Sequence, residues 1–307
     1  MGTNGARLLG ILLAVPLCLA NAGAAPDQAR APAAPSVTYY PANHADPLPG
    51  VLVLGGAEGG DAWATVVAKR LSAHGYAAIA KAYFKSPGLD AELQQIPLER
   101  LQAGIDELAS DPRVDHERLA VLGFSKGAEA ALLLASADPR IKAVVAGSPS
   151  DVVWQGISRT SAAVRSSWTQ AGRPLPFVPF APCPDCRSLG ALYENSRADD
   201  EAVAAAAIPI ERAHGPILLI ASGSDAVWPS RTMADALQAR LARRGFGYPV
   251  TMLRYPDGGH FTLGPLAPEQ AAEDAAFGGG TTAGIVAARQ DSWPKVVAFL
   301  DRALGVR

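Results

Sequence analysis

The fold is decided by one stretch of the chain, Leu119-Ala-Val-Leu-Gly-Phe-Ser-Lys-Gly-Ala-Glu-Ala-Ala-Leu-Leu-Leu-Ala135. Its first four residues form an apolar run of the kind found in buried strands, and its last eight are rich in Ala and Leu, as in a buried helix. Between them, Gly123-Phe-Ser-Lys-Gly127 fits the Gly-x-Ser-x-Gly pattern, which places a serine at the tip of a sharp strand-to-helix turn. This order predicts that Ser125 is a nucleophile, in preference to a tight turn with only a structural role.

Strands and helices alternate on both sides of this turn. We expect strands at 51–54, 77–83, 119–122, 141–146, 217–221 and 249–254, and helices at 62–74, 98–109, 126–137, 230–243 and 292–304. Residues 36–40 can form a first short strand. Strands that alternate with helices of about a dozen residues predict an α/β fold, with a mostly parallel central sheet and helices on both faces.

The alternation breaks between about residues 150 and 212. This stretch contains Trp154, Trp168 and Phe177, together with Pro174, Pro176, Pro179, Pro182 and Pro184. Long insertions in compact domains usually serve as lids or binding loops. We therefore predict a cap over the active edge of the sheet. Its aromatic side chains either line a pocket or close the small core of the cap itself.

A serine nucleophile needs a base and a third group that orients the base, in the chain order Ser, Asp or Glu, His. His260 lies in a glycine loop directly after the last predicted strand, whereas His214 precedes a strand and fits a structural role. Asp225 follows the strand at 217–221 and is the favoured acid. Asp257, three residues from His260, fits a turn-forming residue better.

An oxyanion hole in such a site needs two backbone donors. One is the N–H of Lys126, directly after the nucleophile. The other is expected from Gly56 or Ala57, in the loop Gly55-Gly-Ala-Glu-Gly-Gly60. A phosphate loop is the rival interpretation of this loop, but the spacings of the known phosphate-loop motifs are missing.

Three further residues are candidates for contact with a substrate, namely Glu58, Trp154 and Trp228. Glu58 and the side chain of Lys126 belong to the presumed mouth of the site, where solvated surface charge is the plainer interpretation for both. Trp63 and Trp228 flank the site in sequence, and either can be a core residue.

The net charge and the N-terminal residues indicate which partners and which cellular location to expect. The chain has 307 residues and a net charge of −2, without the Lys/Arg cluster of a nucleic-acid binder. Residues 1–24 have the pattern of a secretory signal peptide, with 25–47 as a lead-in and 48–307 as the folded domain. We therefore expect a periplasmic or secreted protein without a stable membrane anchor after cleavage. The oligomeric state is left open.

Cys183 and Cys186 form a Cys-x-x-Cys pair in a proline-rich stretch. A redox motif needs a thioredoxin-like context, and a zinc site needs two more ligands near by. Neither is present in the sequence around the pair. A local disulfide is therefore favoured over a reduced, redox or metal-binding pair.

Several motifs in order resemble one family. They are Val51-Leu-Val-Leu-Gly-Gly-Ala-Glu-Gly-Gly60, Gly123-Phe-Ser-Lys-Gly-Ala-Glu129, Gly223-Ser-Asp-Ala-Val-Trp-Pro-Ser230 and the tail from Gly279 to Leu300. Residues 48–304 are similar to the C-terminal catalytic domain of the acyl-CoA thioesterase / bile acid-CoA:amino acid N-acyltransferase family, with dienelactone hydrolases as neighbours. The resemblance implies an α/β-hydrolase fold, acyl transfer from a thioester, and Ser125, Asp225 and His260 as nucleophile, acid and base.

The sequence differs from the animal members of that family in three respects, one of which is the signal-peptide pattern of residues 1–24, which points away from the cytosol, where acyl-CoA is made. No N-terminal β-sandwich domain is expected ahead of the first catalytic strand. The nucleophile is Ser, whereas the resemblance links the amino-acid-conjugating members with Cys, so hydrolysis is favoured over conjugation.

The sequence thus predicts a serine hydrolase that cleaves acyl thioesters through an acyl-enzyme, without a cofactor or metal. The alternatives are a carboxylesterase or dienelactone-hydrolase-like enzyme that acts on oxygen esters, and an acyl-CoA:amino acid N-acyltransferase. A binding protein on a hydrolase scaffold that has lost catalysis is disfavoured, because all three triad residues are present in order.

Overall fold

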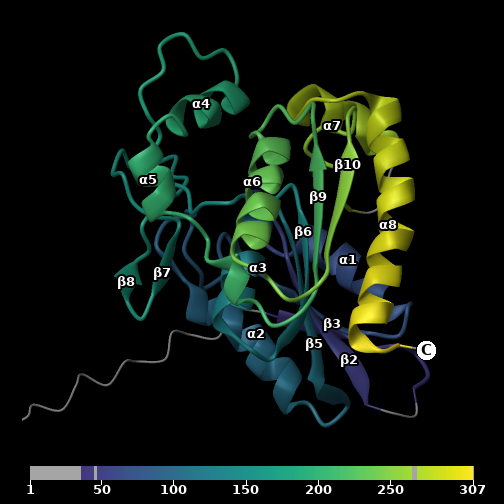
Figure 1. Ribbon diagram of the computed structural model, residues 1–307. Coiled ribbons are helices and arrows are strands. Elements are labelled where there is room, and N and C mark those ends of the chain that lie inside the picture. The colour runs from purple at the N-terminus through teal and green to yellow at the C-terminus, as the bar shows by residue number, and fades with distance from the viewer. Residues whose placement is uncertain (1–35, 45–46, 265–267, 307) are drawn as a thin grey trace, which may run out of the picture. The chain divides into compact units, whose positions relative to one another are not determined.

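A seven-stranded sheet lies at the centre of the structure, a computed structural model that describes residues 36–44, 47–264 and 268–306 (Figure 1). In sheet order, its strands are β1 (Ser36–Tyr39), β3 (Ala77–Lys81), β2 (Leu48–Leu54), β5 (Val114–Phe124), β6 (Ile141–Gly147), β9 (Ile217–Ser222) and β10 (Val250–Tyr255). Only β1 pairs in the antiparallel direction, with β3. The predicted mostly parallel sheet is confirmed.

Helices cover both faces of the sheet (Figure 1). On one face lie α1 (Ala62–Ser72) and α8 (Thr282–Leu304), and on the other α2 (Leu98–Ser110), α3 (Lys126–Ala137) and α6 (Ser230–Arg243). The side chains of β2 alternate between the two cores. Val51 and Val53 pack toward α1 and α8, while Leu52 and Leu54 pack toward α2 and α3. A strand buried on both faces needs such a continuous apolar run.

The C-terminal region departs from the sequence-based expectation. Helix α8 begins at Thr282, ten residues before the predicted start, because the side chain of Thr281 accepts a hydrogen bond from the Gly284 N–H and caps the helix. Pro294 lies inside this helix. The short helices η2 (Pro268–Gln270) and α7 (Ala271–Gly278), which precede α8, were not predicted.

The insertion between β6 and β9 adds no strand to the central sheet. It contains β7 (Trp168–Gln170), β8 (Arg173–Pro174), α4 (Leu189–Ser196), α5 (Asp200–Ala205) and η1 (Ile210–Arg212). We call residues 150–212 the cap. Strand β7 pairs with β8 and with β4 (Ile96–Pro97), which directly precedes α2. A bridge between Leu93 and Ile157 makes a second connection from the cap to the region before α2.

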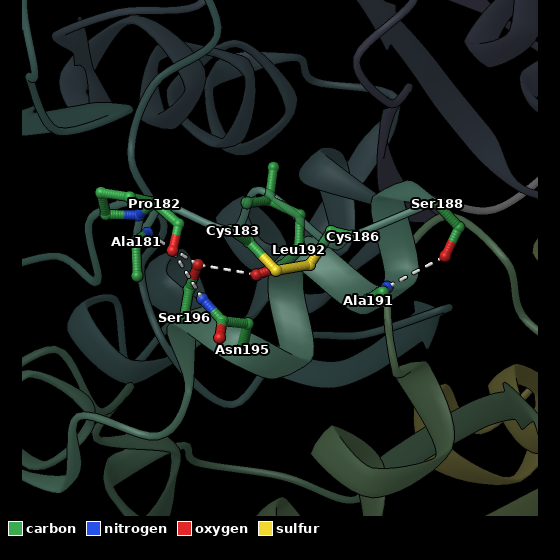
Figure 2. The surroundings of a disulfide bond; sticks show 9 residues. All are labelled: Ala181, Pro182, Cys183, Cys186, Ser188, Ala191, Leu192, Asn195 and Ser196. Atoms are coloured by element: carbon green, nitrogen blue, oxygen red, sulfur yellow. Dashed lines mark hydrogen bonds between the residues drawn. A yellow bond between two sulfur atoms is a disulfide. The ribbon is translucent and has the colours of Figure 1, made fainter.

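The two cysteines of the cap are joined by a disulfide next to α4 (Figure 2). The Cys186 N–H also donates to the Cys183 carbonyl at 3.1 Å, which closes a tight turn. Helix α4 is capped by the Ser188 side chain, and at its far end Ser196 Oγ accepts from the Ala181 N–H at 3.0 Å (Figure 2). The disulfide turn therefore lies against the helix that follows it.

The predicted signal peptide, residues 1–24, lies outside the described residues. Within the predicted lead-in, Ser36–Tyr39 forms the edge strand β1. In the described part of the chain, no helix has both the length and the apolar character that crossing a membrane requires.

Candidate active site

Ser125 occupies the sharp turn between β5 and α3 in a strained conformation. Its φ is 55° and its ψ is −121°, a region that non-glycine residues rarely adopt. The surrounding backbone holds it there, because the Ser125 N–H donates to the Gly147 carbonyl at 2.9 Å and its own carbonyl accepts from Ala128 and Glu129. Such strain costs of order 1–3 kcal/mol and clusters at functional sites.

Two glycines make the turn sterically feasible. A Cβ atom on Gly123 would lie 2.1 Å from the Gly127 carbonyl oxygen, and one on Gly127 would lie 2.2 Å from the Gly55 carbonyl oxygen. Both distances are far inside van der Waals contact with backbone atoms that cannot move aside. The small residues before and after the serine are thus a requirement of backbone packing.

A chain of hydrogen bonds connects the three residues predicted to act together. His260 Nε2 lies 2.9 Å from Ser125 Oγ, and His260 Nδ1 lies 2.9 Å from Asp225 Oδ2. The residues follow β5, β9 and β10, whose carboxyl ends meet at one edge of the sheet. A proton on Nδ1, facing the carboxylate, leaves Nε2 free to accept the Ser125 hydroxyl proton.

Backbone contacts hold the acid and the imidazole in place. Asp225 Oδ1 accepts from the N–H groups of Val227 and Trp228, at 3.0 and 3.2 Å. The His260 N–H donates to the Gly278 carbonyl at 2.8 Å. Both side chains are almost fully buried, with 1% of Asp225 and 4% of His260 exposed.

The two rejected candidates lie elsewhere. His214 is exposed and precedes β9, so it lies at the opposite end of the strands from Ser125. Asp257 makes a turn, with its carbonyl accepting from the Thr281 N–H at 3.0 Å.

The structure distinguishes the two candidate donors in the loop after β2. The Gly56 N–H donates to the side chain of Glu58 at 2.9 Å. Within the described residues, no acceptor binds the N–H groups of Ala57 and Lys126, and both residues line the cavity that contains Ser125. Of the predicted backbone donors beside Ser125, those that remain available are therefore the N–H groups of Ala57 and Lys126.

Lys126 and Glu129 form a buried ion pair close to Ser125 in sequence, within the first turn of α3. Lys126 Nζ lies 2.8 Å from Glu129 Oε2, and the two side chains are 1% and 0% exposed. Desolvation lowers the pKa of the Lys126 amine and raises the pKa of the Glu129 carboxyl, and their mutual attraction opposes both shifts. The interpretation of the Lys126 side chain as solvated surface charge is wrong, because α3 carries it into the core.

Glu129 also binds the cap. Its Oε1 atom accepts from the indole N–H of Trp168 at 2.7 Å and from the backbone N–H of Trp154 at 3.1 Å. Helix α3, which begins directly after Ser125, is therefore connected to two points of the cap through one carboxylate. No signal in the sequence indicated this role for Glu129.

An apolar cavity of about 400 Å³ opens above Ser125 and His260. Its walls come from the cap, the loop after β9, the loop after β10 and α7. The apolar side chains that line it include Phe124, Ile157, Phe180, Leu189, Leu192, Val227, Phe261 and Phe277. Arg159 also lines this cavity and is exposed at its mouth.

The three predicted substrate contacts divide between the cavity and the core. Glu58 and Trp228 line the cavity. Trp154 does not: it is fully buried in a cluster with Tyr193 and Trp228, and its indole N–H donates to Ser150 Oγ at 2.9 Å. Trp154 therefore supports the wall from behind. Trp168 is likewise fully buried, and neither it nor Phe177 lines the cavity.

The carboxyl group of Glu58 is held against the loop although part of the side chain is exposed at the cavity mouth. Desolvation raises the pKa of this carboxyl, and the hydrogen bond from Gly56 opposes the shift. A folded-state pKa above the unfolded value means that the folded protein binds the proton more tightly, so stability falls as pH rises through that pKa.

Glu58→Gln is therefore expected to raise the melting temperature at pH 7–8, because the amide can still accept from Gly56 but carries no charge. Partial exposure keeps the gain small, at no more than about 2 °C. The gain should disappear below about pH 4, where both forms are neutral. Melting curves from pH 4 to pH 8 would show this, and a lower melting temperature at pH 8 would contradict it.

No group of three His, Cys, Asp or Glu side chains that could hold a metal ion occurs among residues 36–44, 47–264 and 268–306.

Comparisons with known proteins agree on the class of this chain. The family described as BAAT / Acyl-CoA thioester hydrolase C terminal matches residues 96–306. Human acyl-coenzyme A thioesterase 6 is 26% identical over 264 residues, covering 84% of this chain and 61% of that protein. Mouse acyl-coenzyme A amino acid N-acyltransferase 1 is 27% identical over 276 residues, with 84% and 60% covered. The chain thus spans about 60% of the length of these relatives.

Solved structures show the same fold. A putative dienelactone hydrolase from Klebsiella pneumoniae superposes with a TM-score of 0.56 at 19% identity, covering 87% of this chain and 92% of that one. MGS-M1, an α/β hydrolase from a deep-sea metagenome library, gives a TM-score of 0.51 at 15% identity, with 84% and 86% covered. The chain therefore has an α/β-hydrolase fold and belongs to the BAAT / acyl-CoA thioester hydrolase C-terminal family.

Proposed function

We propose that this protein hydrolyses acyl thioesters of the acyl-CoA class through a catalytic triad of Ser125, His260 and Asp225. The observation that carries the proposal is the 2.9 Å contact between Ser125 Oγ and His260 Nε2 at the floor of an apolar cavity. A strained serine, an oriented imidazole and an apolar binding space are the parts that acyl transfer requires.

In the proposed reaction, Ser125 Oγ attacks the thioester carbonyl while His260 takes its proton. Asp225 holds the imidazole in the required tautomer and stabilises the imidazolium that forms. Collapse of the tetrahedral intermediate breaks the carbon–sulfur bond, and His260 returns the proton to the leaving thiolate. A water activated by His260 then cleaves the acyl-enzyme and releases a carboxylic acid.

The oxyanion of each tetrahedral intermediate is assigned to the N–H groups of Ala57 and Lys126. Both line the cavity beside Ser125 without an acceptor among the described residues. The N–H of Lys126 is the first of α3, so the positive end of the helix dipole supports the same negative charge. Gly56 is not assigned as a donor, because its N–H already binds Glu58.

A cation at the cavity mouth fits a leaving group of the CoA type. Arg159 is exposed, and its guanidinium forms no ion pair among the described residues. The loop that carries it is anchored, since Glu92 accepts from the Arg159 N–H at 3.0 Å. A planar guanidinium binds phosphate oxygens well. CoA carries phosphate groups, and a simple ester does not.

Free-thiol release from a series of acyl-CoA substrates, beside p-nitrophenyl esters of the same acids, tests this function. We expect release that depends on the enzyme, and Arg159→Ala should raise the KM for acyl-CoA about tenfold with little change for the uncharged esters. Turnover of esters alone would point to an oxygen-ester hydrolase. Acyl transfer to added glycine or taurine would point to an N-acyltransferase.

Export is a separate proposal that rests on the signal-like sequence of residues 1–24. The disulfide between Cys183 and Cys186 supports it, because disulfides persist in oxidising compartments. An acyl-thioester hydrolase outside the cytosol would meet thioesters other than freshly made acyl-CoA, and the substrate series above should include short pantetheine thioesters for that reason.

A further inference from the structure

Two polar groups on the wall of the cavity above Ser125 have no hydrogen-bond partner. The indole N–H of Trp228 is buried and has no acceptor among the described residues. The hydroxyl of Tyr193 has no hydrogen bond within the same residues, although Tyr193 is only 5% exposed. Both residues line the cavity. Buried polar groups in proteins are nearly always paired, so the unpaired indole N–H of Trp228 calls for an explanation, and the Tyr193 hydroxyl is a second unpaired group on the same wall.

Three buried aromatic side chains away from this cavity have partners for their polar atoms. The Trp154 indole donates to Ser150 Oγ, the Trp168 indole donates to Glu129, and the Tyr83 hydroxyl donates to the Gly55 carbonyl at 2.8 Å. Among the described residues, the indole nitrogen of Trp228 is the only fully buried aromatic polar atom without a partner.

The two rings lie together and close to the reacting atoms. The ring of Trp228 meets that of Tyr193 edge-to-face at 5.6 Å, and it meets the imidazole of His260 edge-to-face at 5.9 Å. Trp228 is thus in contact with both the catalytic base and the phenol ring.

Neighbouring contacts keep the rings from turning their polar atoms toward solvent. The backbone of Trp228 is bound to Asp225, and the ring of Tyr193 packs edge-on against Trp154 at 4.7 Å and Phe180 at 5.1 Å. The two rings are therefore held in the cavity wall, where a bound ligand can supply the missing partner.

The acyl group, not the leaving group, is the part of a thioester that fits this wall. The remaining lining is largely hydrocarbon and aromatic, and a polyanionic CoA group would lose its hydration there without compensation. A plain fatty acyl chain would fill the space but would leave the Tyr193 hydroxyl and the Trp228 N–H unpaired.

We propose that the acyl group accepted here carries an oxygen a few bonds from its carbonyl carbon, bound by Tyr193 Oη and Trp228 Nε1. Hydroxyacyl and oxoacyl thioesters belong to this class. The inference rests on the proposed thioester hydrolysis and narrows its substrate. Tyr193 is in this view a specificity-determining residue, because a site with unpaired polar groups discriminates strongly against a substrate that cannot pair them.

The test compares octanoyl-CoA with octanoyl-CoA that bears one hydroxyl, moved along the chain from carbon 2 to carbon 6. For at least one position, we expect kcat/KM to exceed that of the plain chain by about ten- to a hundredfold. Tyr193→Phe should reduce that ratio about tenfold or more, and Trp228→Phe should reduce it as well. Tyr248→Phe, which removes an exposed hydroxyl outside the cavity, is the matched control and should leave the ratio unchanged.

Two outcomes overturn the inference while thioester hydrolysis stands. One is a plain chain that is cleaved as well as every hydroxylated one, and the other is a Tyr193→Phe variant that changes both rates by the same factor. If no thioester is cleaved, the proposed function fails, and binding decides the inference on its own. In that case, hydroxyoctanoates should raise the melting temperature of Ser125→Ala more than octanoate does, and equal shifts would reject the polar subsite.

Discussion

Ser125→Ala is expected to lower kcat by a factor on the order of 10⁴–10⁶ while leaving the fold intact. The variant keeps Asp225, His260 and the backbone donors but has no atom that can attack the carbonyl. Because alanine is smaller than serine and the turn is held by backbone hydrogen bonds, the melting temperature should change little. Thiol release from acyl-CoA and a melting curve measure the two effects.

Labelling by a fluorophosphonate provides an independent readout of the same serine. The wild-type protein should be labelled, and Ser125→Ala should not. Ser136→Ala is a suitable control, because that hydroxyl lies near the far end of α3, where it donates to the Leu132 carbonyl. Its activity and labelling should match those of the wild type. If Ser125→Ala retained a tenth of the wild-type activity, the proposed mechanism would be wrong.

Glu129→Ala is expected to destabilise the protein by about 3–5 kcal/mol. It leaves the ammonium group of Lys126 buried without its partner and removes the acceptor of the Trp168 and Trp154 N–H groups. The melting temperature should fall by roughly 10 °C. Because these contacts join the cap to the helix behind the nucleophile, activity should fall at temperatures where the variant is still folded.

A double variant separates the lost charge from the lost volume. Lys126→Met combined with Glu129→Leu removes both charges and should recover a large part of the stability. Glu117→Ala, at a largely exposed carboxylate, should change the melting temperature little. A double variant no more stable than Glu129→Ala would show that the packing of Trp168, not the unpaired charge, is the main cause.

The central sheet and the strand-to-helix turn at Ser125 could be predicted because each depends on a short pattern of neighbouring residues. The run Val51-Leu-Val-Leu54 is apolar at every position. The two glycines around Ser125 are needed because a Cβ atom at either position would clash with backbone atoms. The order of Ser125, Asp225 and His260 follows from the order of parallel strands. The strand, the turn and the chain order of the three residues can all be inferred from residue types and their spacing in the sequence.

The lining of the cavity could not be predicted in the same way. Most of the cap and the loop after β9 lack regular periodicity, so nothing in the sequence shows that Trp228 lines the cavity while Trp154 lies in the core behind it. The same holds for the Lys126 side chain, whose direction depends on a partner one helical turn away. The Glu58 contact with Gly56 depends on the path of a glycine loop, which many sequences of that composition could follow differently.

The attachment of the cap has a consequence for how substrates are sorted. The pairing of β7 with β4, the bridge from Ile157 to Leu93 and the hydrogen bond from Trp168 to Glu129 pin the cap to segments on both sides of α2. A cap that is attached at several separate points is expected to move little, so the cavity should keep its volume when a longer molecule binds. If the proposed acyl thioesters bind there, the fixed volume of the cavity should set an upper limit on the length of the acyl chain that is accepted.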